Sequence, residues 1–76
     1  MDFGKRLREA RLISHLTQQA LSDKIGLALR SYQCYEQGTR EPSLSTLCRI
    51  ADILGVSTDY LLGRDDPRAE SFDGRP

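Results

Sequence analysis

Apolar side chains recur at intervals of three and four residues in five short segments of the chain. This period places each set on one face of a helix, and no segment shows the sustained alternation of a strand. The pattern therefore predicts an all-α domain of five helices. The predicted core-facing residues are Phe3, Leu7, Ala10, Ile13 or Ser14, Ala20, Leu21, Ile25, Tyr32, Tyr35, Leu44, Leu47, Ile50, Ala51, Leu54, Tyr60, Leu61 and Leu62.

Residue types that begin and end helices mark the boundaries of these segments. Thr17, Ser43 and Ser57 precede the second, fourth and fifth segments, where a side-chain oxygen can cap a helix. Gly26 fits the left-handed conformation that ends the second helix. We expect the first and third helices over about residues 2–13 and 28–37.

The length and composition indicate one domain followed by a short tail. The chain has 76 residues, enough for one small core. We expect the folded domain to cover residues 1–63. Residues 64–76 hold two prolines, one glycine and seven charged side chains, and we predict a disordered tail or the start of a linker there.

The distribution of charge and apolar residues narrows the class of protein. The net charge is zero, but basic residues gather near the N-terminus, which predicts a local basic patch of Lys5, Arg6, Arg8 and Arg11. No apolar run is long enough to span a bilayer, and no apolar signal region opens the chain. We expect a cytoplasmic protein with no membrane partner.

Groups that catalyse reactions or bind metals are scarce. Cys34 and Cys48 lack a CxxC partner and are expected to be free thiols. His15 has no catalytic or metal-ligating companions and is expected to be an exposed polar residue. We expect no metal, no cofactor and no enzymatic activity.

The stretch from Leu16 to Pro42 carries a two-helix pattern around one glycine. It closely resembles the helix-turn-helix of the phage-repressor and Cro-like (XRE-type) family, and the resemblance extends from about Phe3 to Gly63. The matching residues are Thr17-Gln18, Leu21, Ile25-Gly26, Tyr32, Tyr35-Glu36, Gly38 and Glu41-Pro42-Ser43-Leu44. The resemblance implies a compact five-helix domain that places its third helix in the major groove of duplex DNA.

A helical wheel divides the third helix into two faces. Ala28, Tyr32, Tyr35 and Glu36 form the inner side, whereas Arg30, Cys34 and Gln37 lie opposite, with Gln33 at the edge. Arginine can donate two hydrogen bonds to guanine, and glutamine can pair with adenine. The alternative is that these polar side chains only solvate an exposed face.

The resemblance assigns further DNA contacts around this helix. Ala28 and Leu29 open the helix at positions where the family usually has polar DNA-contacting residues. Leu29 either touches a thymine methyl group or packs against the protein. Cys34 also occupies a matching base-contact position, although a thiol is a weak hydrogen-bonding group.

Other residues match positions near the DNA backbone. Thr17 and Gln18 open the second helix, where Gln18 matches the family's phosphate-contacting glutamine. Free N–H groups and the helix dipole favour a phosphate at this end. Arg40, in the loop after the third helix, is a second phosphate candidate.

The resemblance also implies a structural ion pair. Glu36 lies on the inner side of the third helix, where an unpaired carboxylate would be costly. The family's matching arginine, here Arg11, pairs with this glutamate. We expect the same pair in this chain, with a structural and orienting role.

These features predict a transcriptional regulator, specifically a repressor, that binds a palindromic operator as a homodimer. The resemblance implies a dimer contact near the fourth and fifth helices, at Tyr60, Leu61 or Leu62. One alternative is an antitoxin-like protein-interaction module that also binds DNA and whose partner engages the tail or the fifth helix. Another is a redox-sensing regulator that uses Cys34.

Overall fold

The computed structural model describes residues 3–64, which fold into five helices and contain no strand. The helices are α1 (Phe3–Ile13), α2 (Gln18–Ile25), α3 (Leu29–Gln37), α4 (Leu44–Leu54) and α5 (Thr58–Leu62). The predicted all-α, five-helix fold is confirmed. Residues 1–2 and 65–76, including nearly all of the predicted tail, lie outside the described residues.

Hydroxyl side chains cap three of the helices as the sequence predicts. Thr17 Oγ1 accepts a hydrogen bond from the backbone N–H of Ala20 at 3.0 Å. Ser43 and Ser57 cap α4 and α5 in the same way. One boundary is wrong: Ala28 precedes α3 in an extended conformation, with φ −67° and ψ 145°, instead of forming its first turn.

Gly26 permits the tight connection between α2 and α3. Its φ of 88° lies in the left-handed region, and its N–H contacts the carbonyls of Ser22 and Asp23. Because the connection is short, the two helices of the predicted helix-turn-helix are held at a fixed angle.

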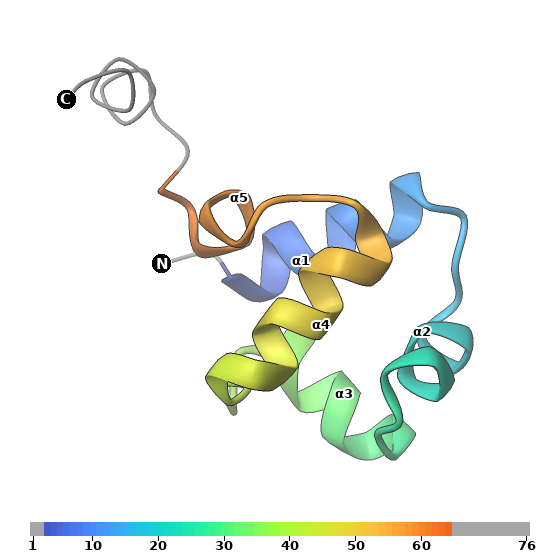
Figure 1. Cartoon of the computed structure of the whole chain (residues 1–76). Coiled ribbons are helices and arrows are strands. Elements are labelled where there is room, and N and C mark those ends of the chain that lie inside the picture. The colour runs from blue at the N-terminus through green and yellow to red at the C-terminus, as the bar shows by residue number, and fades with distance from the viewer. Residues whose placement is uncertain (1–2, 65–76) are drawn as a thin grey trace, which may run out of the picture.

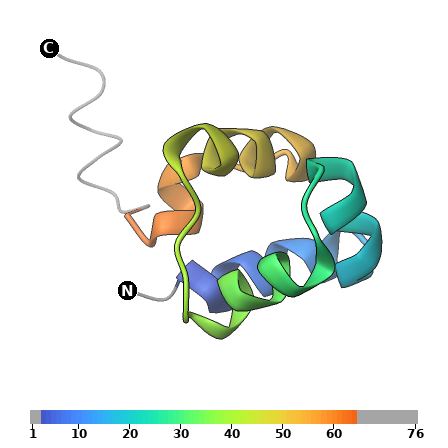
Figure 2. The ribbon, with the colours of Figure 1, turned by 90° about the horizontal axis from the view of Figure 1, so that it is seen from below.

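The helices surround one small core (Figures 1 and 2). Helix α1 packs against α3 and α5, α2 packs against α3 and α4, and α4 packs against α5. The start of α1 therefore lies beside α5 in both views. The buried hydrophobic residues are Phe3, Leu7, Ala10, Leu21, Ile25, Tyr32, Tyr35, Leu47, Ile50, Ala51, Leu54 and Leu61.

Two predicted core positions are wrong. Ile13 is 74% exposed and Leu44 is 81% exposed. At 100° per residue, Leu44 lies roughly 70° from the centre of the stripe that α4 buries, and Ile13 lies roughly 100° from that of α1. Ser14, the other candidate at the end of α1, is half-buried on the correct side.

The N-terminal basic patch is smaller than predicted. Arg11 is buried, and Arg6 is half-buried with its guanidinium carbon 5.3 Å from the centre of the Tyr60 ring. Arg6 Nη1 also donates a hydrogen bond to the Tyr60 carbonyl at 3.4 Å. Of the four cations, Lys5 and Arg8 remain exposed.

Gly4 allows α1 to approach the end of α3 very closely. A Cβ atom at Gly4 would lie 2.4 Å from the Glu36 carbonyl oxygen and 2.8 Å from that of Tyr35. These are backbone atoms, so they cannot move aside as a flexible side chain would. The contact requires a residue without a side chain.

Replacing Gly4 with alanine should therefore lower the free energy of unfolding by about 1–2 kcal/mol. Alanine normally stabilises a helix relative to glycine, but here the overpacking cost exceeds that gain. Urea unfolding would measure the change, with the exposed neighbour Lys5→Ala as the control, expected within about 0.5 kcal/mol of wild type. A Gly4→Ala protein more stable than wild type would show that the helices separate at little cost.

Candidate nucleic-acid interface

A bidentate ion pair joins α1 to α3 beneath the predicted DNA-binding surface. Arg11 Nε donates to Glu36 Oε2 at 2.6 Å, and Arg11 Nη2 donates to Glu36 Oε1 at 3.3 Å. The two side chains are only 9% and 5% exposed. The predicted Arg11–Glu36 pair is therefore confirmed, and its geometry fixes the position of α3 relative to α1.

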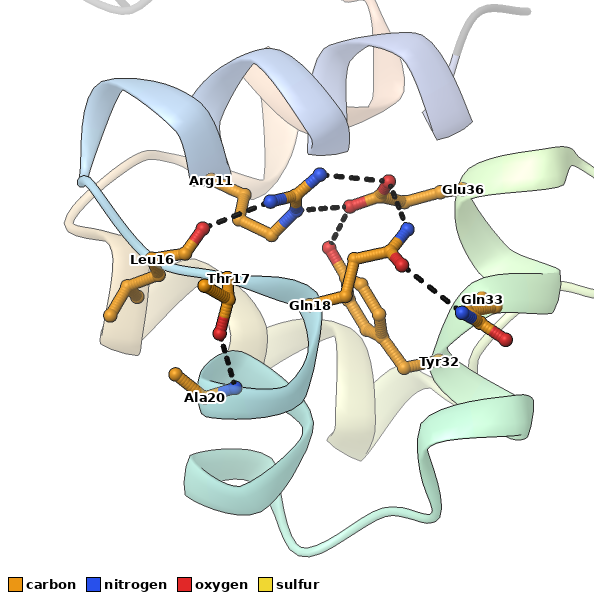
Figure 3. A network of polar contacts seen from close by, with 8 residues as sticks. All are labelled: Arg11, Leu16, Thr17, Gln18, Ala20, Tyr32, Gln33 and Glu36. Carbon is orange, nitrogen blue, oxygen red and sulfur yellow. Dashed lines mark hydrogen bonds and ion pairs between the residues drawn. The ribbon is translucent and has the colours of Figure 1, made fainter.

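The pair lies at the centre of a larger polar network (Figure 3). Arg11 Nη1 donates to the Leu16 carbonyl at 2.9 Å, which holds the segment just before α2. The hydroxyl of Tyr32 donates to Glu36 Oε2, and Gln18 Nε2 donates to Glu36 Oε1 at 3.0 Å. Three helices are thus tied to one carboxylate.

The network keeps Glu36 ionised. Burial raises the pKa of this carboxyl, but the hydrogen bonds from Arg11, Tyr32 and Gln18 lower the pKa by more than burial raises it. The net shift of the Glu36 pKa is therefore downward. The hydrogen bond to Glu36 likewise raises the pKa of Arg11. The pKa of Tyr32 is raised mainly by burial and secondly by the hydrogen bond to Glu36. The Tyr32 hydroxyl therefore stays protonated and can donate to Glu36.

The downward pKa shift predicts how Glu36 contributes to stability at different pH values. A carboxyl with a folded pKa below its unfolded value stabilises the fold above the unfolded pKa, near 4.5. That contribution is lost as the pH falls through the folded pKa.

Urea unfolding of wild type and Glu36→Gln between pH 7 and pH 3 tests this. The difference in unfolding free energy should be largest near neutrality and should shrink below about pH 4.5. A difference that is constant across this range would mean that Glu36 has the same pKa in the folded and unfolded states.

Gln18 and Gln33 connect the network to the surface of α3. Gln33 Nε2 donates to Gln18 Oε1 at 3.1 Å, and both residues are half-buried. The sequence pattern did not reveal this contact because it depends on how α2 crosses α3. The Tyr32 hydroxyl was also missed, although its spacing of four residues from Glu36 on one helix could have indicated the bond.

The outer surface of the helix-turn-helix carries most of the other predicted DNA-contacting residues. Arg30, Gln37 and Arg40 are exposed, and so is Ala28. Leu29 is half-buried, an exposure compatible with either of its two predicted roles. The exposure of Ala28 corrects its placement on the inner side of α3.

The two residues that open the second helix segment differ in their surroundings. Thr17 is exposed, and its hydroxyl caps α2. The Gln18 side chain is engaged by Glu36 and Gln33. The first N–H groups of a helix have no acceptor within it, so the backbone N–H groups of Gln18 and Gln19 are donors without an intrahelical partner.

The remaining chemical groups are simple. Both cysteines are free thiols; Cys34 is half-buried and Cys48 is exposed. No cluster of three His, Cys, Asp or Glu residues suited to a metal occurs among residues 3–64. Within the same part of the chain, no helix has the length and apolar character needed to cross a membrane.

Comparisons with known proteins agree with this geometry. A family model described as helix-turn-helix matches residues 7–61, from α1 into α5. The chain is 47% identical over 60 residues to the uncharacterized HTH-type transcriptional regulator YqaE of Bacillus subtilis. The matched region covers 79% of this chain and 52% of that protein. It is 41% identical over 64 residues to the cryptic phage CTXphi transcriptional repressor RstR of Vibrio cholerae, covering 84% and 57%.

A solved structure shares the fold. The restriction-modification controller protein C.AhdI from Aeromonas hydrophila superimposes with a TM-score of 0.74 and 33% sequence identity, covering 79% of this chain and 91% of that one. The chain spans about half the length of the curated relatives it matches. The matched family model covers most of the chain and all five helices contribute to it, so this protein belongs to the helix-turn-helix family of phage-repressor and XRE type.

Proposed function

We propose that the chain binds duplex DNA with α3 lying in the major groove. The observation that carries the proposal is that a buried network anchors α3 from its inner side while its outer side stays exposed. Arg11 neutralises Glu36, so the helix does not present that charge to the DNA. The transcriptional regulators and the repressor among the relatives support the same function.

Exposed side chains on α3 would read the bases. Arg30 can donate two hydrogen bonds to O6 and N7 of a guanine, and Gln37 can pair with an adenine. Three small or apolar residues would pack against the same bases or let the helix approach them closely: Ala28, Leu29 and Cys34. Of these, Arg30 combines full charge, exposure and bidentate geometry, and we assign it the largest contribution to specificity.

Contacts with the phosphate backbone would set the register of α3. The backbone N–H groups of Gln18 and Gln19 lie at the positive end of α2, where a phosphate is favoured. Thr17 precedes them, and Arg40 supplies an exposed cation in the loop that follows α3. Phosphate contacts position the protein and carry no sequence information themselves.

Arg40→Ala should weaken binding to all DNA sequences alike. It should also reduce the salt dependence of binding by about one unit of slope, because one phosphate contact is lost. Titrations of a specific and an unrelated duplex at several salt concentrations would measure both effects. A change in the preferred sequence would instead place Arg40 against a base.

We further propose that the protein is a repressor that acts as a homodimer on a palindromic operator in the cytoplasm. One domain of this size covers few base pairs, so two copies are needed for specificity. The dimer contact would use the half-buried Tyr60 and Leu62 near α5. Leu61, also predicted there, is fully buried in the core and is not available for this contact.

Selection from a random duplex library tests the proposed function. The 76-residue chain should enrich a palindromic sequence with two half-sites about one helical turn apart, or a multiple of that distance. Occupation of such an operator is the proposed mechanism of repression, with no chemical step. A folded chain that enriches no sequence would contradict specific DNA binding, and enrichment of single half-sites would contradict the dimer.

A further inference from the structure

A chain of side-chain hydrogen bonds runs from the buried ion pair to the surface of α3. Glu36 accepts from Gln18 Nε2 at 3.0 Å, and Gln18 Oε1 accepts from Gln33 Nε2 at 3.1 Å. Arg11 holds the other end of this chain, at Glu36. Gln33 thus ends a continuous path that begins inside the protein (Figure 3).

The chemistry of the groups gives this path a direction. An ionised carboxylate only accepts hydrogen bonds, so Glu36 requires the nitrogen of the Gln18 amide. The Gln18 side-chain oxygen must then face Gln33, and Gln33 donates a hydrogen bond to it through its side-chain nitrogen. Figure 3 shows the Gln33 oxygen pointing away from the network. Among the contacts of residues 3–64, the Gln33 carbonyl oxygen and one of its side-chain N–H groups therefore have no partner.

We infer that Gln18 is a positioning residue that fixes the Gln33 amide and thereby makes Gln33 select adenine over guanine. This inference rests on the proposed binding of α3 in the major groove. Adenine presents an N6 donor and an N7 acceptor, which match the free oxygen and the free N–H of Gln33. Guanine presents two acceptors, N7 and O6, and its O6 would meet the Gln33 oxygen.

The contribution of Gln18 is selectivity more than affinity. An unrestrained glutamine can turn its amide by 180° and offer its nitrogen to guanine. With Gln18 in place, that turn would set two carbonyl oxygens against each other and would leave Gln33 with no bond to the network. The free-energy cost of turning the Gln33 amide therefore weakens binding to guanine and leaves binding to adenine unchanged.

The hydrogen-bond path can be tested without DNA. In ¹H–¹⁵N spectra of the free protein, the side-chain amide of Gln33 should show one hydrogen shifted and slowed in exchange with water. In Gln18→Ala that signal should move to the position typical of a free amide. Glu36 keeps Arg11 and Tyr32 as partners in this variant, so we expect it to fold. An unchanged Gln33 signal would overturn the path.

Base selection is tested on the duplex obtained from the library. Exchanging the contacted adenine for guanine should weaken wild-type binding by about 5- to 150-fold. In Gln33→Ala the two duplexes should bind alike, and in Gln18→Ala the ratio should fall to about threefold or less. The matched control is Asp23→Ala on the same helix, whose exposed side chain bonds only to Gln19 among the described contacts and which should keep the wild-type ratio.

Two results would separate failure of this inference from failure of the proposed function. The inference alone would be overturned if Gln18→Ala or Gln33→Ala bound DNA specifically and kept the wild-type ratio of affinities for the adenine and guanine duplexes. No enriched duplex for the wild-type chain would overturn the proposed function and adenine selection together, while the spectra would still report whether Gln18 holds Gln33.

Discussion

Alanine in place of Arg11 or of Glu36 should lower the free energy of unfolding by about 3–5 kcal/mol. Each substitution leaves the other charged group nearly buried without its partner, since the side chains are 9% and 5% exposed. Glu36 also holds Tyr32 and Gln18, and Arg11 holds the carbonyl of Leu16, so hydrogen bonds are lost along with the charge. For a domain this small, such a loss is a large fraction of the total stability.

The double variant should cost less than the sum of the two single variants. Removing both groups leaves no unpaired charge, and the coupling between neighbours appears as the difference from additivity. Urea unfolding of the four proteins measures that coupling. Where a single alanine variant does not fold, the same cycle with Arg11→Lys and Glu36→Gln provides it. Strict additivity would mean that the pair contributes nothing beyond its separate contacts.

Much of the fold follows from local signals in the sequence. Thr17, Ser43 and Ser57 cap their helices through hydroxyl groups, a purely local interaction that the residue type predicts. Apolar periodicity located all five helices for a similar reason. It misplaced Leu44, because a residue in the first turn can match the spacing of a stripe and still lie off its centre.

Long-range contacts were harder to predict. The Arg11–Glu36 pair was expected from the family resemblance, not from spacing, because 25 positions separate the two residues. The close approach at Gly4 depends on how α1 meets the end of α3. The Gln18–Gln33 bond likewise depends on the angle between α2 and α3, which no pattern within either helix specifies.

Arg30→Ala should weaken binding to the selected operator by about 1–3 kcal/mol and relax the preference at one base position. Arg30 is exposed on α3, and its guanidinium has the geometry to donate two bonds to one guanine. Its removal should not affect stability beyond about 0.5 kcal/mol, because surface substitutions away from buried contacts have small effects.

The matched control is Lys24→Ala, which removes an exposed cation from the last turn of α2. This variant should show only a small change that is the same for all sequences. Fluorescence titrations of the operator and of single-base variants would compare the two proteins. Equal binding of Arg30→Ala and wild type to the operator would remove Arg30 from the base-contacting set.

The claim that α3 reads the major groove through Arg30 is tested most directly by changing single atoms of the operator. Replacing the contacted guanine with 7-deazaguanine removes the N7 acceptor from the major groove, whereas inosine removes only the amino group in the minor groove. Wild-type binding should weaken with 7-deazaguanine and should be nearly unaffected by inosine, and Arg30→Ala should be insensitive to both. Loss of wild-type binding with inosine alone, or an equal loss with 7-deazaguanine in wild type and Arg30→Ala, would contradict this account.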